Sequence, residues 1–213
     1  MSGLYPIIDV DSLAALKLPV LDFARAVLET QPKLVQLRAK HLSARETLDL
    51  LRALRPLCPR GTTELFANDR PDLALLADCD GVHVGQDDLP VSAVRQFAPS
   101  LKIGVSTHSL AQLDAALQAR PDYAAFGPIF ATESKARPDP VVGVEALVEA
   151  ARRARAQGCS IVAIGGISAG NAAQLAGHGV LAAVIAALVP PDGDLESVAD
   201  RARDLQAALQ GPA

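Results

Sequence analysis

The feature that most constrains this chain is a regular alternation of short β-like runs with helix-like runs along its whole length. The eight strand-like runs are Leu4–Val10, Leu34–Leu37, Glu64–Ala67, Gly81–Val84, Lys102–Val105, Tyr123–Phe126, Ile161–Ile164 and Leu181–Ile185. Most are continuously apolar, which is typical of strands that are buried on both faces of a parallel sheet. A helix is expected from Ser43, because Glu46 follows three residues later in the spacing of a capping box.

Eight strand units that alternate with helical units, with no Ser/Gly-rich linker between them, predict an α/β fold. We expect a single (β/α)8 TIM barrel domain that spans residues 1–213, a common length for this architecture. An open, doubly wound sheet with fewer strands is the alternative. The other helix-like segments are Leu73–Ala77, Val91–Phe97, Leu110–Ala119, Val144–Ala156, Asn171–Ala176 and Leu195–Leu209.

Composition argues against nucleic acid and membrane partners. The net charge is −4, there is no long run of Lys or Arg, and Trp is absent, so neither a phosphate-binding stripe nor a base-stacking surface is expected. The longest apolar run, Val180–Val189, is too short to span a bilayer. Three isolated cysteines and the lack of a signal peptide predict a cytoplasmic protein. A homo-oligomer is possible.

In a barrel the functional residues lie at the C-terminal ends of the strands, so polar residues that follow each strand are the candidates. Gln36, Arg38 and Lys40 follow the second strand at a spacing of two and share one side of an extended chain. Arg and Lys suit phosphate oxygens, although a solvent-exposed strand end is an equal alternative. Asn68 and Asp69 follow the third strand, where capping the next helix is a strong alternative.

Carboxylates at two adjacent strand ends can converge on one hard cation. The fourth strand is followed by Gly85-Gln86-Asp87-Asp88, beside the Asn68-Asp69 pair of the third. Mg²⁺ typically binds one or two protein carboxylates together with substrate phosphate oxygens and water.

The last four strands are followed by hydroxyls and glycines. Ser106-Thr107-His108-Ser109 comes after the fifth, with His108 expected to be structural, and a long loop from Gly127 to Gly143 comes after the sixth. Gly165-Gly166 follows the seventh strand, and Ala186-Ala187 the eighth, where barrels frequently bind phosphate. Together the strand ends predict an enzyme that binds a metal-associated pyrophosphate on one side and a monophosphate on the other.

At these residues the chain resembles the thiamine-phosphate synthase family over nearly its whole length. The matching pieces are Gln36-Leu37-Arg38-Ala39-Lys40, Asn68-Asp69, Gly81 to Asp88, Gly104-Val105-Ser106, Gly127-Pro128-Ile129-Phe130, Thr132-Glu133-Ser134-Lys135 and Ala163 to Ile167. The resemblance implies condensation of 4-amino-5-hydroxymethyl-2-methylpyrimidine diphosphate with hydroxyethylthiazole phosphate. The products would be thiamine phosphate and pyrophosphate, formed by a dissociative substitution that uses Mg²⁺.

The resemblance also implies residue roles. Gln36, Arg38, Lys40 and Asn68 would hold the pyrimidine diphosphate, Asp69 and Asp88 would ligate Mg²⁺, Ser106 and Lys135 would contact the pyrophosphate, and Thr132, Ser134, Gly165, Gly166, Ile185 and Ala186 would bind the thiazole phosphate. Of these, Arg38, Ser106 and Lys135 would be catalytic. The chain departs from the family pattern at Ala131, Ser134 and Ile185, where Pro, Thr and Ser are usual.

Three other functions remain open from the sequence. A thiazole tautomerase would share the barrel, but such relatives tend to lack the Asn-Asp pair and to carry His where this chain has Pro128. The other two are a non-catalytic phosphate-ligand-binding barrel and an unrelated phosphate-binding barrel of the tryptophan pathway. Both are less favoured, because the acidic pair and Lys135 point to catalysis with a metal.

Overall fold

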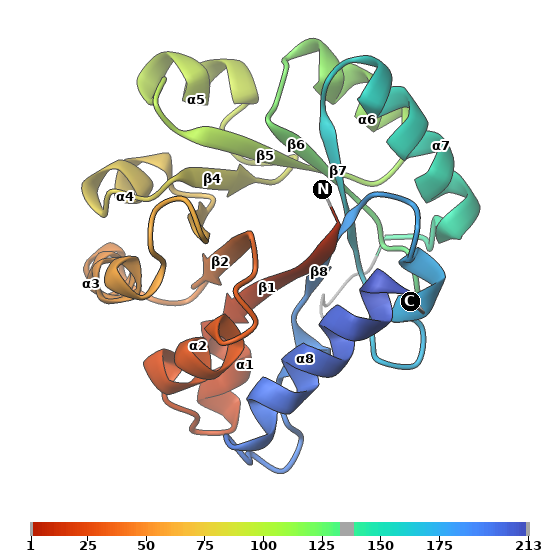
Figure 1. The fold of residues 1–213 in the computed structure, drawn as a ribbon. Helices are drawn as coiled ribbons and strands as arrows, with labels where there is room; N and C mark the ends of the chain where they lie inside the picture. The colour runs from red at the N-terminus through yellow and green to blue at the C-terminus, as the bar shows by residue number, and fades with distance from the viewer. Residues whose placement is uncertain (1, 133–138, 212–213) are drawn as a thin grey trace.

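A closed, parallel eight-stranded barrel forms the centre of the computed structural model, which describes residues 2–132 and 139–211 (Figure 1). The strands are β1 (Gly3–Asp9), β2 (Leu34–Arg38), β3 (Glu64–Asn68), β4 (Gly81–Val84), β5 (Lys102–Thr107), β6 (Tyr123–Phe126), β7 (Ser160–Ile164) and β8 (Leu181–Val184). They follow one another in chain order, and β1 pairs with β8 from Gly3↔Leu181 onward, which closes the sheet. The predicted (β/α)8 barrel is therefore confirmed, and the open-sheet alternative is wrong.

Helices surround the barrel on its outside (Figure 1). The α-helices are α1 (Val10–Ala15), α2 (Val20–Leu28), α3 (Ala44–Leu54), α4 (Pro71–Leu76), α5 (Val91–Phe97), α6 (Leu110–Gln118), α7 (Gly143–Ala156) and α8 (Ser197–Gln210), and the 3₁₀ helices are η1 (Arg55–Leu57), η2 (Ala172–Leu175) and η3 (Ala186–Leu188). The predicted capping box is present, because the Ser43 side chain accepts from the Glu46 N–H and Glu46 accepts from the Ser43 N–H at 2.9 Å. Within the described ranges, no helix is both long and apolar enough to cross a membrane.

The structure differs from the sequence prediction at several boundaries. The first strand ends at Asp9 rather than Val10, because Asp9 accepts a hydrogen bond from the N–H of Ser12 and thereby caps α1. The sequence pattern located neither α1 nor α2. The predicted segment Asn171–Ala176 is reduced to the single turn of η2, whose N-cap Asn171 binds the preceding loop instead of capping the helix and whose C-cap Ala176 is already extended, with ψ 142°.

Side chains of each strand alternate between two cores. Leu4 and Ile8 pack outward in the layer between sheet and helices, whereas Tyr5 and Ile7 point into the barrel. Glycine makes room for the large inner rings, since a Cβ on Gly104 would lie 2.0 Å from the ring of Tyr123. Because the strands are covered on both faces, their sequences read as continuous apolar runs.

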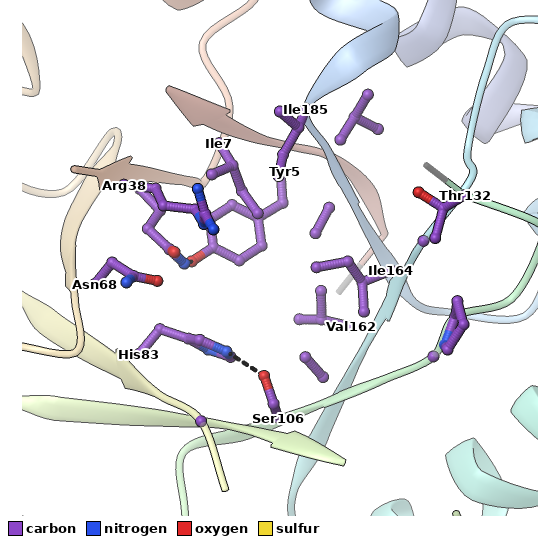
Figure 2. A pocket seen from close by; sticks show the side chains of 18 of the residues that line it. Tyr5, Ile7, Arg38, Asn68, His83, Ser106, Thr132, Val162, Ile164 and Ile185 are labelled. Atoms are coloured by element: carbon purple, nitrogen blue, oxygen red, sulfur yellow. Dashed lines mark hydrogen bonds between the residues drawn. The ribbon is translucent and has the colours of Figure 1, made fainter. Parts of the chain in front are cut away.

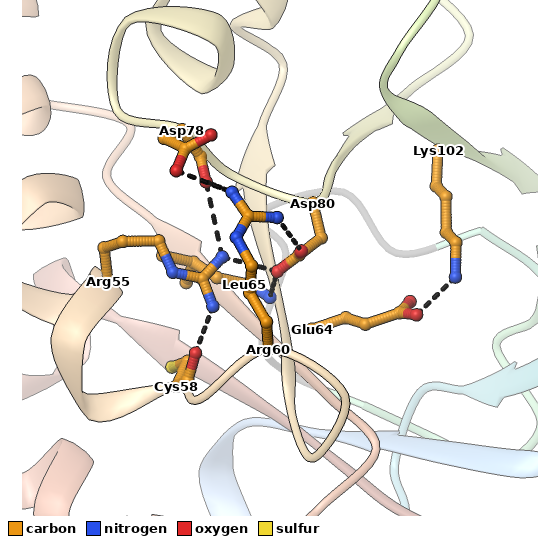
Figure 3. Close-up of polar contacts among 8 residues, drawn as sticks. All are labelled: Arg55, Cys58, Arg60, Glu64, Leu65, Asp78, Asp80 and Lys102. Carbon is orange, nitrogen blue, oxygen red and sulfur yellow. Dashed lines mark hydrogen bonds and ion pairs between the residues drawn. The ribbon is translucent and has the colours of Figure 1, made fainter.

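The N-terminal end of the barrel is held by carboxylates that bind strand backbone. Asp80, just before β4, accepts the N–H of Leu65 in β3 at 2.8 Å and pairs with Arg55 at 2.5 Å (Figure 3). Asp122, just before β6, accepts the N–H of Ile103 in β5 at 2.8 Å in the same way. These contacts join neighbouring strands at the end of the barrel that in this architecture contributes to stability.

Candidate active site

A cavity of about 400 Å³ opens at the C-terminal ends of the strands (Figure 2). The predicted site residues that line it are Gln36, Arg38, Lys40, Asn68, Asp69, Asp88, Ser106, Thr132, Gly165, Gly166, Ile185 and Ala186. Ser134 and Lys135 were also predicted, but they lie outside the described residues. The barrel brings together all the predicted site residues that the structure describes, although they come from seven different strand ends.

The basic side chains that follow β2 are held by carboxylates. Arg38 donates from Nη1 to Oδ2 of the buried Asp9, at the end of β1. Lys40 lies 2.5 Å from Oδ2 of Asp69, at the end of β3. Both side chains line the cavity, and 27% of the Arg38 side chain and 42% of the Lys40 side chain remain exposed, so this strand end is also open to solvent.

Asp69 does not cap the helix that follows it. The N-cap residue of α4 is Arg70, which makes no side-chain cap hydrogen bond. Asp69 instead adopts a left-handed backbone with φ 62°, a conformation that Asp and Asn tolerate better than most residues. Neither Asn68 nor Asp69 is the N-cap that the alternative interpretation required, and both side chains line the cavity.

Two carboxylates face each other at the ends of β3 and β4. Burial raises the pKa of Asp69, and contact with Asp88 raises it further, although Lys40 acts in the opposite direction. Asp88 itself is oriented by the N–H of Gly85, which donates to Oδ2 at 2.7 Å. A carboxylate whose pKa is raised by burial and by a second carboxylate fits a divalent cation, whose charge would stabilise the ionised form.

This donor set also fits the way Mg²⁺ binds. Among the residues that the structure describes, no three His, Cys, Asp or Glu side chains form a metal-binding cluster. Two protein carboxylates leave most of the coordination sphere to substrate phosphate oxygens and water, which is the usual arrangement for Mg²⁺.

On the opposite side of the cavity, the loop after β7 presents backbone at two glycines. Gly165 and Gly166 have φ values of 96° and 66°, and a Cβ on Gly166 would lie 2.3 Å from the carbonyl oxygen of Ala131. Asn171 fastens this loop, since its amide donates to the carbonyl of Gly166 at 2.8 Å and accepts from the N–H of Ser168 at 2.8 Å. Only glycine fits so closely under the loop after β6, so backbone groups are available here to an anion.

Several lining residues were not predicted as site residues. Among them are Tyr5 and Ile7 of β1, His83 of β4, and His108 and Asp139 in loops. His83 and Tyr5 stand within strands, and a polar side chain in an otherwise apolar run was the available signal. His108 was expected to be structural, and its Nδ1 does lie 2.8 Å from the carbonyl oxygen of Gly127.

Over most of its length this chain is similar to thiamine-phosphate synthases. A family model described as thiamine monophosphate synthase matches residues 4–188. The thiamine-phosphate synthase of Chlorobium luteolum is 42% identical over 191 residues and covers 89% of this chain and 87% of its own length. The thiamine-phosphate synthase of Koribacter versatilis is 43% identical over 197 residues, which cover 88% of this chain and 90% of the relative. The solved thiamine phosphate pyrophosphorylase from Pyrococcus furiosus superposes with a TM-score of 0.82 at 30% identity, covering 97% and 96% of the two chains.

Proposed function

The chain belongs to the thiamine monophosphate synthase family and is a transferase, and we propose that it makes thiamine phosphate from two phosphorylated substrates. The electrophile would be 4-amino-5-hydroxymethyl-2-methylpyrimidine diphosphate. The nucleophile would be hydroxyethylthiazole phosphate. Pyrophosphate would be the second product.

One observation supports this pair of substrates above others. A single cavity has two cations and two facing carboxylates on its β2–β4 side and a glycine-lined backbone surface on its β7–β8 side. The first side suits a metal-associated diphosphate, and the second suits a monophosphate. Two separate anion sites are what a condensation of two phosphorylated molecules requires.

The residues present suit a dissociative substitution. The bond between the pyrimidine methylene carbon and the diphosphate oxygen breaks, and the electron pair leaves with the pyrophosphate. The lone pair of the thiazole nitrogen then forms the new carbon–nitrogen bond, so no general base is needed. Arg38 and Lys40, already oriented by Asp9 and Asp69, stabilise the negative charge as it develops on the leaving group.

Asp69 and Asp88 would hold Mg²⁺ in this reaction. When bound, the ion supplies positive charge beside the diphosphate and so lowers the cost of its departure. Ser106 would donate a hydrogen bond to the pyrophosphate. Lys135 would add a further cation beside the pyrophosphate. We therefore expect Lys135→Ala to reduce turnover far more than affinity for the thiazole phosphate. A change confined to that affinity would refute this role.

The thiazole phosphate would bind at Thr132, Ser134, Gly165 and Gly166 and at backbone groups of Ile185 and Ala186. Except for Ser134, which lies outside the described ranges, these residues line the cavity. Ile185 offers no hydroxyl where the family usually has Ser. Binding at this strand end therefore depends on backbone N–H groups.

Omission of single components tests the proposal. The purified chain is incubated with Mg²⁺ and both substrates, and each component is then left out in turn. We expect thiamine phosphate and pyrophosphate only from the complete mixture. Full product formation without added metal, after treatment with a chelator, would remove Mg²⁺ from the proposal.

The same assay separates the thiazole tautomerase. The chain is given a thiazole phosphate tautomer alone, and its conversion is followed. Pro128, at the position where tautomerases tend to carry His, lines the cavity and has no group that transfers a proton. We expect no conversion, and clear turnover of the tautomer would favour the alternative.

A further inference from the structure

Five polar side chains form a continuous chain of hydrogen bonds across the floor of the cavity. Gln36 Nε2 lies 2.8 Å from the hydroxyl of Tyr5, and the hydroxyls of Tyr5 and Tyr123 are 2.9 Å apart. His83 lies 2.9 Å from Tyr123 through Nδ1 and 2.9 Å from Ser106 through Nε2 (Figure 2 shows the last contact). The members of this polar chain come from β2, β1, β6, β4 and β5, so it runs through the interior of the barrel.

The two ends of the polar chain face the cavity, and so do Tyr5 and His83 between them, whereas Tyr123 does not line it. Gln36 and Ser106 both line the cavity. Oε1 of Gln36 makes no hydrogen bond with any other described residue, so it is available to a bound molecule. Tyr5 and Tyr123 are only 1% and 3% exposed. Burial raises the pKa of Tyr5 to about 12 and that of Tyr123 well above its usual value, so both keep their hydroxyl hydrogens at neutral pH.

Counting hydrogens gives the polar chain a direction. The amide of Gln36 donates to Tyr5, so the single hydroxyl hydrogen of Tyr5 goes to Tyr123. The hydrogen of Tyr123 then goes to Nδ1 of His83, which places the proton of a neutral imidazole on Nε2. Nε2–H donates to Ser106, and the hydrogen of Ser106 remains for an acceptor in the cavity.

The opposite direction is disfavoured with this amide orientation. If Tyr123 donated to Tyr5, the hydroxyl hydrogen of Tyr5 would have no acceptor among the described residues. A buried donor without a partner costs free energy that a satisfied one does not. Turning the Gln36 amide over would reverse every bond, and Ser106 would then spend its hydrogen on His83. The two ends are therefore always of opposite polarity.

We propose that Tyr5, Tyr123 and His83 are positioning residues that make Ser106 a donor and Gln36 an acceptor toward the bound substrate. The ligand that matches these ends carries an amino group beside Gln36 and phosphate oxygens beside Ser106. An aminopyrimidine diphosphate has both groups, so the inference rests on the proposed function and adds a mechanism of recognition to it. The three positioning residues need not touch the substrate.

The tautomer of His83 tests the direction without any activity measurement. A nitrogen NMR spectrum of the free protein, labelled at histidine, distinguishes protonated from unprotonated ring nitrogens. The chain has four histidines, and His83→Gln identifies the signals that belong to this one. We expect the proton on Nε2 alone. A proton on Nδ1, alone or together with Nε2, would overturn the proposal even if the enzyme is active.

A double-mutant cycle tests whether the positioning acts through Ser106. Tyr123→Phe removes one hydroxyl from the polar chain and keeps the ring. We expect about a tenfold loss of kcat/KM, the size of one lost hydrogen bond to a charged group. In the Ser106→Ala background the same change should cause no further loss, because the hydroxyl on which it acts is gone. Equal losses in both backgrounds would contradict the proposal.

Two further variants keep the cycle decisive. Phe66→Leu is the matched control, since its ring packs 5.6 Å from that of Tyr123 but lies outside the polar chain. Its effect should be the same in both Ser106 backgrounds. If Tyr123→Phe does not fold, Tyr5→Phe breaks the polar chain at the preceding bond and takes its place.

Failure of the proposed function leaves a different signature. If the wild-type chain forms no product from the two substrates, the function fails, and the cycle is then carried out on the binding of inorganic pyrophosphate with Mg²⁺ by calorimetry. Coupling between Tyr123 and Ser106 in that binding supports the positioning role. Additive effects refute it.

Discussion

Raising the pH above 10 should unfold this protein before its tyrosines ionise in the folded state. The chain has two tyrosines and no tryptophan, so tyrosinate absorbance reports on Tyr5 and Tyr123 alone. Both hydroxyls are buried in the barrel interior and hydrogen-bonded to each other at 2.9 Å. Burial raises the pKa of Tyr5 from 10.0 to about 12, and that of Tyr123 in the same direction.

The size of the effect follows from proton linkage. A folded-state pKa that is raised contributes stability below the unfolded pKa and loses it as the pH rises through the folded value. For Tyr5 the stability is fully present below pH 10 and is lost toward pH 12. Each pKa unit corresponds to about 1.4 kcal/mol, so ionisation of Tyr5 lowers the free energy of unfolding by roughly 3 kcal/mol over this range. Tyr123 adds to that loss, against a total stability of about 5–15 kcal/mol for an ordinary domain.

Two measurements on one series of samples check this expectation. Tyrosinate absorbance and far-ultraviolet circular dichroism are followed from pH 8 to pH 12.5, and urea unfolding at selected values gives the free energy of unfolding. We expect absorbance and loss of helix to rise together. Between pH 10 and 12 the free energy should fall more steeply than in Tyr5→Phe by about 1.4 kcal/mol per pH unit.

The phenylalanine variants remove the contributions of other groups. Burial also raises the pKa of Cys58 to about 11 and that of Cys79 to about 12, and both thiols are present in every variant. Their effect therefore cancels in the comparison between wild type and Tyr5→Phe or Tyr123→Phe. Tyrosinate forming near pH 10 in a chain that keeps its native circular dichroism would refute the reasoning, because the phenols would then be accessible to solvent.

Three substitutions test other parts of the structure. Asp88→Asn should raise the Mg²⁺ concentration required for half-maximal activity by about tenfold or more, because one charged ligand is lost. The control Asp87→Asn, at the exposed neighbouring residue, should leave the metal titration unchanged. An unaltered titration in Asp88→Asn would show that Asp88 is not a ligand. Gly166→Ala should raise KM for the thiazole phosphate by about tenfold in steady-state kinetics. The added Cβ would lie 2.3 Å from the carbonyl oxygen of Ala131 and shift the loop after β6. An unchanged KM would show that this phosphate binds elsewhere. Asp80→Ala should lower the free energy of unfolding by about 2–4 kcal/mol in urea titrations, because it leaves a strand N–H without its acceptor and the mostly buried guanidinium of Arg55 without its carboxylate. The control Asp78→Asn, at a carboxylate that is 77% exposed and on a left-handed backbone that Asn tolerates, should change it by less than about 0.5 kcal/mol, and equal effects would argue against the strand-end role of Asp80.

The sequence alone determined the architecture and the end of the barrel that carries the site. Each strand and most helices follow from local patterns, such as the apolar run Tyr123–Phe126 and the capping box at Ser43, which need no knowledge of distant residues. Parallel strands present their C-terminal ends on one face, so listing the residues after each strand was enough to find twelve residues, from Gln36 to Ala186, that line the cavity, although it missed others such as His83. Resemblance to a family then implied their roles, which stay predictions.

Only the tertiary structure decided which side chains are partners. Asp9 was hidden by a strand boundary one residue too long, and its role in holding Arg38 depends on β1 and β2 lying side by side. Tyr5 and Tyr123 are 118 residues apart in the chain and meet because the barrel closes and glycines leave room for their rings. Local patterns report whether a residue points inward, but the contacts across the interior depend on the register of all eight strands together, which no single segment encodes.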